Sequence, residues 1–369
     1  MKVLWFTTRN TADLCSTTLD ALGEGLVSNE HHVTVINSDV EGSHSHLSWT
    51  HVSVQAQAIR GTKARILGRR MRQWLVGFEP DKETVAIVDW RIASSLSAIL
   101  KQKSIPWILM DRSPPADRGI LAKLQWPVWK KAWNLVKSRQ AHSGCIVSLP
   151  HGEFIHSRVG VVKSQMVEIP AGVDVSLFQP GVKYDTLTLI YHGRLDRHRG
   201  ILSLPMLQEN LRQNDIKSKL ILVGEGDAFG GLQLMAENRD DLEVHSTLSK
   251  EQLSKKLAQA HIGLLPMPAT KIWSLASPLK RSEYAASGLL IFGIDHSGHR
   301  LKQRSQPEWV HFVDQENFHL DGVKWIQQLT HERIQSLAKE ARRYAVENLN
   351  WSNSINALEQ ACLSSLTEK

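Results

Sequence analysis

Hydrophobic positions along the chain fall into short runs separated by amphipathic stretches, a pattern typical of parallel strands joined by helices. The apolar run at residues 2–8 predicts a buried strand. Residues 15–27 then repeat leucines at helical spacing, and β-branched residues return at 32–36. This strand–helix–strand order is the seed of a parallel sheet with helices on its faces. Further strand candidates follow at residues 84–89, 105–110 and 144–148.

A second series of strand candidates begins at residue 186, again with helical patterns such as 250–260 and 278–287 in between. Two consecutive series predict an α/β protein with two Rossmann-like, doubly wound sheets. A single TIM barrel is the alternative, because eight evenly spaced strand–helix units would alternate in the same way. The strand candidates of the second series are residues 186–192, 219–223, 242–245, 261–266, 289–293 and 310–313.

The boundary between the two series is expected at residues 173–183, where the periodicity is lost and Pro and Gly appear. We therefore expect an N-terminal domain over residues 1–178 and a C-terminal domain over 179–350. Residues 351–369 read as a last helix that either packs locally or crosses back to the first domain.

Composition and charge narrow the class of protein. The 369 residues are 42% hydrophobic and 22% charged, which excludes collagen-like, coiled-coil and disordered chains. No apolar run is long enough to span a bilayer, and three widely spaced cysteines indicate neither a disulfide framework nor a CxxC site, so we expect a cytoplasmic protein. The net charge of +7 favours an anionic partner. Most of it lies in residues 1–180, which hold 21 Lys and Arg against 15 Asp and Glu.

A glycine- and arginine-rich loop, YHGRLDRHRG at residues 191–200, follows the first strand of the second series. Gly193 and Gly200 allow tight turns and close approach of the backbone to a ligand. Arg194 and Arg199 are placed to converge on one diphosphate, since the planar guanidinium suits phosphate oxygens. The alternative for this loop is a solvated basic turn.

A short helix is predicted at residues 277–288. Ser277 suits the N-cap, Pro278 the first helical position, and Gly288 the left-handed residue that follows the last turn. The backbone N–H groups of Leu279 and Lys280 would then point out of the helix start, where anions bind.

Glu283 lies one turn further into this helix, where a carboxylate can accept two sugar hydroxyls. The alternative is a surface carboxylate paired with Lys280. Between the two motifs lies LILVGEGD, a strand followed by Gly224 and Gly226, which is weak as an isolated signal because the pattern GxGxxG is not completed.

Taken in order, GR-x4-R-G, VGEGD, HIGLLPMP and SPLKRSEYAASGLLIF resemble the C-terminal half of family-4 retaining glycosyltransferases of the GT-B fold. IPAGVDVSLFQP and Asn350-Trp351-Ser352 extend the resemblance to most of the chain. It implies two Rossmann-like domains facing across a cleft, and a nucleoside-diphosphate sugar as donor. It also implies that Arg194 and Arg199 hold the diphosphate, that Glu283 holds the ribose, and that Gly224 lies at the donor.

The sequence departs from that family at two positions. Arg199 stands where the family more often has Lys, which keeps the charge. Leu275 stands where the family's E-x7-E motif has its earlier Glu, and a leucine cannot hydrogen-bond a sugar hydroxyl. Members with the shorter PLK-x2-EY form share this loss.

The chemistry implied by the resemblance is transfer with retention of configuration and without a metal. Two arginines and a helix N-terminus can stabilise the leaving diphosphate, and no Asp-x-Asp motif stands out, so we expect neither a metal nor another cofactor. On the acceptor side, Asp111 follows a strand end and is predicted to orient or deprotonate an acceptor hydroxyl. The alternative is a loop cap bonded to Arg112 or to nearby backbone.

Two basic segments in the N-terminal half contain no acid. Residues 60–76 carry six cations, including Arg69 and Arg70. Residues 121–140 combine lysines with tryptophans on one helical side, with Pro127 expected in the first turn. This composition predicts an interfacial helix on an anionic membrane. One alternative is that the tryptophans pack on the sheet; another is nucleic acid, for which no recognition motif is present. The membrane-facing candidates in the second segment are Trp126, Trp129, Lys130, Lys131 and Trp133.

The function predicted from the sequence is therefore a retaining hexosyl- or related glycosyltransferase that uses a nucleotide-sugar donor. Its acceptor is expected to be a lipid-linked, glycolipid or polysaccharide hydroxyl at the cytoplasmic face of the membrane, with no nucleic acid as partner. The alternatives are a nucleotide-sugar 2-epimerase of the same fold and a non-catalytic basic binding protein on this scaffold.

Overall fold

The chain forms two compact units, each described here by itself. The computed structural model describes residues 1–10, 16–55, 61–115, 120–303 and 305–367. The first unit comprises Met1–Pro170 together with Trp351–Lys369, and the second comprises Ala171–Asn350.

The first unit is built on a parallel sheet, for which the described residues supply seven strands in the order β3-β2-β1-β4-β5-β6-β7. The chain leaves the central strand β1 toward β2 and β3, then returns to β4 on its other side, which is the doubly wound arrangement. The strands are β1 (Lys2–Phe6), β2 (His32–Asn37), β3 (Thr50–Ser53), β4 (Thr84–Asp89), β5 (Trp107–Met110), β6 (Gly144–Ile146) and β7 (Met166–Glu168).

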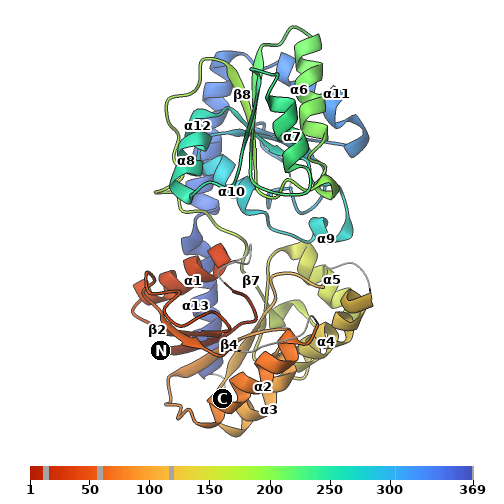
Figure 1. Ribbon diagram of the computed structural model, residues 1–369. Coiled ribbons are helices and arrows are strands. Elements are labelled where there is room, and N and C mark those ends of the chain that lie inside the picture. The colour runs from red at the N-terminus through yellow and green to blue at the C-terminus, as the bar shows by residue number, and fades with distance from the viewer. Residues whose placement is uncertain (11–15, 56–60, 116–119, 304, 368–369) are drawn as a thin grey trace. The chain divides into compact units, whose positions relative to one another are not determined.

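Helices cover both faces of this sheet (Figure 1). On one face α1 packs against α13, which also contacts β4, β5 and β7. On the other, α2 packs on α3, α3 on α4 and α4 on α5. The helices are α1 (Ser16–Ser28), α2 (Lys63–Val76), α3 (Ala93–Gln102), α4 (Ile120–Lys137), α5 (Leu149–Val159) and α13 (Trp351–Thr367), with a 3₁₀ turn at Lys163–Gln165.

The second unit repeats the same plan with six strands among its described residues, all parallel, in the order β10-β9-β8-β11-β12-β13. Here β8 is the central strand and the order reverses between β8 and β11. The strands are β8 (Leu187–His192), β9 (Ser218–Val223), β10 (Leu242–His245), β11 (Ile262–Leu265), β12 (Leu290–Ile294) and β13 (Val310–Val313).

In Figure 1, α6, α7 and α11 lie on one side of these strands and α8, α10 and α12 on the other. The helices are α6 (Ser203–Gln213), α7 (Phe229–Ala236), α8 (Lys250–Gln259), α9 (Lys271–Ser274), α10 (Leu279–Ala286), α11 (Phe318–Gln327) and α12 (His331–Asn348), with 3₁₀ turns at Arg197–Arg199 and Gln315–Asn317.

Several interior strands are buried along their whole length, because helices cover both faces of each sheet. Every residue of β4, β11 and β12 is buried, which explains why these strands read as mainly apolar runs rather than alternating ones.

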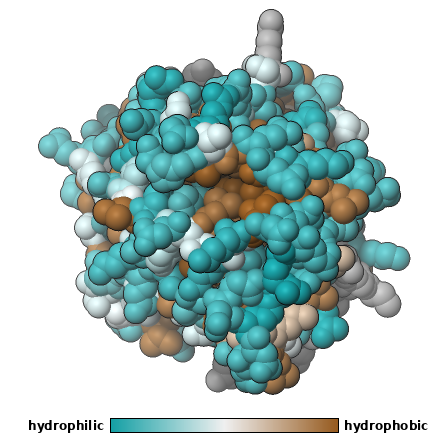
Figure 2. Space-filling view, turned by 90° about the horizontal axis from the view of Figure 1, so that it is seen from above, coloured by the Kyte–Doolittle hydropathy of each residue, from teal (hydrophilic) through white to brown (hydrophobic). Residues whose placement is uncertain are grey.

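Viewed from above, Figure 2 shows mainly hydrophilic side chains, with hydrophobic ones gathered in a hollow near the middle of that face. None of the described helices is both long and apolar enough to cross a bilayer.

The two separate open sheets exclude the TIM-barrel alternative. The expected boundary after residue 178 is wrong, because the chain passes into the second unit after Pro170. The backbone N–H of Val173 bonds to Leu349, and the Val173 and Phe178 side chains belong to the second unit's core. Residues 351–369 belong to the first unit.

The edge strand β3 and the short β7 were not predicted, since neither forms a continuous apolar run. Pro127 lies inside α4 and not in its first turn, because α4 begins at Ile120.

Candidate functional site

The two motifs of the C-terminal half meet at the carboxyl edge of the second sheet. The loop at residues 193–200 leaves the end of β8, and α10 follows the loop that leaves β11. The strand order reverses between these two strands. In open parallel sheets, the crevice outside the carboxyl ends of the strands at such a reversal is where ligands bind.

Two glycines shape this edge. Gly193 has φ +115° and Gly224 has φ +138°, conformations that side-chain-bearing residues rarely adopt. A Cβ on Gly224 would collide with the carbonyl oxygen of Gly193. The turns after β8 and β9 therefore pack backbone against backbone, and both glycines serve the shape of the site.

The two arginines meet around a carboxylate. Arg194 donates from Nε and Nη2 to the two oxygens of Asp196, at 3.2 and 3.0 Å. Arg199 approaches the same carboxylate from Nε at 3.6 Å, and that buried Nε has no hydrogen-bond partner among the described residues. Burial tends to raise the pKa of Asp196, but the two arginines and the backbone N–H of Asp227 outweigh it and hold the pKa below its usual value. The loop thus already gathers two guanidinium groups about one anion.

Arg199 is also held by an aromatic ring from α9. Its guanidinium carbon lies 4.6 Å from the centre of the Trp273 ring, a cation–π distance. The ring of His198 stacks against the same tryptophan at 6.5 Å between centroids. Trp273 is therefore part of the site, although the sequence motifs did not single it out.

The start of α10 is open toward this edge. Its N-cap is Pro278 and its first helical residue is Leu279, so the assignment of Ser277 as N-cap is wrong by one residue. The hydroxyl of Ser277 instead accepts a hydrogen bond from the backbone N–H of Ala171. No side chain caps α10. The first N–H groups, including those of Leu279 and Lys280, remain available to an anion.

Lys280 points back toward the β8 loop. Its ammonium group lies 5.2 Å from the centre of the Tyr191 ring, and its Nζ is the nearest atom to the position of a Cβ on Gly193. Burial, together with the charge of Arg199, lowers the pKa of Lys280 to about 8, against a raising effect of Glu283. An additional anion at this point would favour the protonated lysine.

Glu283 faces His192, the last residue of β8. The His192 Nε2 and Glu283 Oε2 atoms lie 3.0 Å apart, and both side chains are nearly buried. Neither atom has a hydrogen bond of acceptable geometry among the described residues. Buried polar atoms without partners are rare in folded proteins, and they point to a ligand or water that completes them.

The donor residues predicted from the sequence therefore lie together: Gly193, Arg194, Arg199 and Gly224 in the turns, and Leu279, Lys280 and Glu283 on α10. We call His192, Arg194, Arg199, Lys280 and Glu283 the carboxyl-edge site. Reasoning from the sequence missed Asp196 as the counter-charge, since it sits between two arginines in a motif read only for its cations. Leu275, in place of the family's Glu, is buried.

The assignment of Asp111 as a catalytic residue for the acceptor is wrong. Asp111 is 0% exposed and accepts hydrogen bonds from the indole N–H groups of Trp129 at 2.7 Å and Trp133 at 2.9 Å. His151 lies 3.4 Å away. Burial raises its pKa, but His151 and the two indoles outweigh burial and hold it below the usual value. Asp111 is therefore a buried structural residue, and it also accepts a hydrogen bond from the backbone N–H of Ser113, as the alternative of a loop cap held.

The prediction that Trp129 and Trp133 face a membrane is wrong for the same reason, since both are fully buried. The two indoles turn toward the sheet and donate hydrogen bonds to the Asp111 carboxylate. This agrees with the alternative in which the tryptophans pack on the sheet. Trp126 is partly exposed, and Lys130 and Lys131 are exposed beside Leu124 and Val128 on the outer side of α4. Arg69 and Arg70 are exposed on α2.

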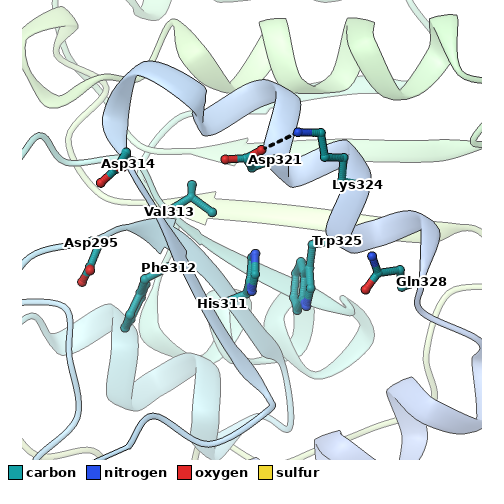
Figure 3. Close-up of a pocket in the computed structure, with 9 residues that line it drawn as sticks. All are labelled: Asp295, His311, Phe312, Val313, Asp314, Asp321, Lys324, Trp325 and Gln328. Atoms are coloured by element: carbon teal, nitrogen blue, oxygen red, sulfur yellow. Dashed lines mark hydrogen bonds and ion pairs between the residues drawn. The ribbon is translucent and has the colours of Figure 1, made fainter.

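A separate cavity of about 540 Å³ lies between the outer strand β13 and α11 (Figure 3). His311 and Trp325 stack at 5.2 Å there, and Lys324 pairs with Asp321. The carboxyl-edge site contributes no residue to it. In the first unit, a much smaller cavity of about 20 Å³ lies between the ends of β1, β4 and β5, beside Arg9, Asp89 and Arg112. Over the described ranges, no group of three or more His, Cys, Asp or Glu side chains is arranged to hold a metal ion.

Comparisons with known proteins agree at the level of fold. No family model and no curated protein matches the sequence. Among solved structures, the chain is similar to a sucrose-phosphate synthase from Thermosynechococcus elongatus, with TM-score 0.78, 16% identity and 100% of both chains covered. A glycosyltransferase from Rickettsia africae has TM-score 0.78, 11% identity, and 100% and 99% coverage of this and that chain.

HepE of Anabaena in complex with UDP has TM-score 0.72 and 10% identity, covering 99% of this chain and 100% of its own. At these low sequence identities the likeness is one of fold. The protein therefore has the α/β architecture of the GT-B glycosyltransferases.

Proposed function

We propose that the protein is a glycosyltransferase that moves a sugar from a nucleoside-diphosphate sugar to an acceptor hydroxyl. One observation carries this proposal: three cations, an uncapped helix start and an unsatisfied carboxylate gather at the carboxyl edge of the second sheet. That set matches the parts of a nucleoside diphosphate, with anionic oxygens at one end and ribose hydroxyls at the other. The neighbour HepE has been solved with UDP and with UDP-glucose, which supports a donor of this class.

The proposed chemistry follows from charge. As the bond between sugar and diphosphate breaks, negative charge grows on the leaving diphosphate and positive charge on the sugar. Arg194, Arg199 and the N-terminus of α10 stabilise the leaving group, in place of a metal. Glu283 fixes the ribose and so orients the scissile bond. Retention of configuration rests on the resemblance of the sequence motifs to family 4.

On the acceptor side, we propose that the first unit docks on an anionic membrane surface. We define the α2/α4 basic surface as Arg69, Arg70, Lys130 and Lys131, all exposed. α3 packs against both helices. On α4, Leu124 is 63% and Val128 38% exposed, and they lie one turn apart, so they can enter the headgroup region while the lysines face phosphate. A lipid-linked, glycolipid or polysaccharide acceptor suits such a location.

Calorimetry with UDP and GDP tests the proposed donor. We expect one of them to bind to the wild type and expect Arg194→Ala and Arg199→Ala each to weaken binding by at least about tenfold, the loss of a charge-assisted contact. Arg212→Ala is the matched control, because Arg212 pairs with Glu209 on α6 as Arg194 does with Asp196.

The same experiment separates the alternatives. Binding of neither nucleotide would favour a non-catalytic scaffold. Incubation of the corresponding nucleotide-sugar with candidate acceptors then distinguishes the enzymes: a glycosylated product supports the proposal, and a sugar altered only at C2 would indicate an epimerase.

A further inference from the structure

The contact between His192 and Glu283 has a feature that the general role of a ribose-binding carboxylate does not explain. His192 ends β8 and Glu283 lies on α10, so two different elements place these side chains together. Nε2 and Oε2 lie 3.0 Å apart, both are shielded from solvent, and neither has a properly oriented hydrogen bond among the described residues.

The imidazole is held firmly in place. Its ring meets the Tyr284 ring edge-on, at 5.3 Å and 88°. The backbone N–H of His192 donates to the Tyr284 hydroxyl at 3.4 Å, and that hydroxyl donates to the carbonyl of Leu264 on β11. Tyr284 is fully buried. The position of Nε2 is therefore set by the core of the second unit and not by Glu283.

Glu283 is the flexible partner. Its side chain has three rotatable bonds, and ordering such a chain costs free energy. The fixed imidazole beside Oε2 gives the carboxylate a preferred orientation. Lys280 interacts electrostatically with Glu283, and its ammonium group lies against the ring of Tyr191 on β8.

We propose that His192 is a positioning residue for Glu283, and that by orienting this carboxylate it strengthens the preference of the site for ribonucleotides over 2′-deoxyribonucleotides. This inference rests on the proposed function and names its substrate class more closely. A ribose hydroxyl can donate to the carboxylate that the imidazole orients. A deoxyribose lacks that hydroxyl and leaves buried polar atoms unpaired, which is why sites built around a hydroxyl reject analogues without it.

Calorimetry with the pairs UDP and 2′-deoxy-UDP, and GDP and 2′-deoxy-GDP, tests the proposal. The wild type is expected to prefer the ribonucleotide by at least about tenfold, the effect of leaving a buried polar group unpaired. His192→Phe, which keeps the ring contact with Tyr284, should reduce that preference to about twofold or less, by weakening the ribonucleotide only. His192→Gln, whose amide can donate to a carboxylate, should restore part of it.

A matched control exists in the same unit. His245 and Glu243 have the same Nε2–Oε2 separation of 3.0 Å, at the end of β10 and outside the carboxyl-edge site. His245→Phe should keep the wild-type preference. Equal weakening of both sugars by His192→Phe would mean a purely structural role and would overturn the inference, as would a wild type that binds both sugars equally. Absence of binding for all four nucleotides would contradict the proposed function itself.

Discussion

Single side chains at the carboxyl-edge site are held by partners that a ligand must replace or join. Asp196 interacts with both Arg194 and Arg199, and the Trp273 ring lies against the guanidinium of Arg199. A diphosphate carries more negative charge than one carboxylate, so it can draw Arg194, 42% exposed, away from Asp196. Arg199 is less free to move, since its guanidinium rests on the indole.

Trp273 should therefore contribute to nucleotide affinity without touching the base. Replacing it by alanine removes a cation–π contact worth roughly 0.5–2 kcal/mol, so UDP or GDP binding should weaken about 2- to 30-fold. Trp273→Phe keeps a ring and should lose less. Calorimetry measures both, and an unchanged affinity in Trp273→Ala would show that Arg199 needs no aromatic support.

Lys280 should take up a proton when nucleotide binds. Its pKa is lowered to about 8 in the free protein, mainly by burial. A bound diphosphate favours the charged form, so the pKa rises and protons are taken up near pH 8, while affinity falls as the pH rises further. Calorimetry at about pH 8 in two buffers of different ionisation enthalpy measures this uptake. Lys280→Met should abolish it, and an equal uptake in that variant would exclude Lys280 as the source.

At the scale of elements, α4 joins a structural anchor and an exposed charged surface. Trp129 and Trp133 turn inward to Asp111, at the end of β5, while Lys130 and Lys131 turn outward. Tryptophans three and four residues apart lie on one side of a helix whether that side meets lipid or sheet. The sequence therefore predicted that the tryptophans share one side of the helix, but not that this side faces the sheet. The orientation depends on Asp111, which follows β5 and lies nine residues before the start of α4.

Removing that carboxylate should destabilise the first unit. Asp111→Ala leaves two buried indole N–H groups without their acceptor and removes the carboxylate beside His151, at a cost of about 3–5 kcal/mol. Because the folded pKa of Asp111 is lowered, its stabilising effect is present above the unfolded pKa of about 4 and is lost as the pH falls through the folded value.

Urea unfolding of the wild type and Asp111→Ala checks both statements. The difference in unfolding free energy should be largest near neutral pH and should narrow below about pH 4. A difference that stays constant across this range would mean that the ionised carboxylate is not what holds α4.

The α2/α4 basic surface makes a separate prediction. Lys130→Glu combined with Lys131→Glu should weaken binding to vesicles that contain anionic lipid, by up to about 1 kcal/mol for each lysine removed and more for reversal. Co-sedimentation at low salt measures it. The double substitution Lys250→Glu and Lys255→Glu, at exposed positions of α8, changes the net charge equally and should leave binding unaltered. If the two double variants behave alike, the surface has no specific role.

At the scale of the whole molecule, the order of strands and helices was predictable because buried parallel strands read as apolar runs and glycines mark the turns after them. The convergence of Arg194, Arg199 and Glu283 was predictable too, since all three follow central strands at one edge of a sheet. The domain boundary and the buried, structural position of Asp111 were not predictable. Both depend on contacts between distant segments, such as Val173 with Leu349 and Asp111 with Trp129.

The most direct test of the account is a crystal structure of the protein with UDP or GDP bound. We expect the diphosphate against Arg194, Arg199 and the first N–H groups of α10, and the ribose hydroxyls on Glu283 beside His192. A nucleotide bound elsewhere, with Arg194 still on Asp196 and the His192–Glu283 contact unaltered, would contradict it.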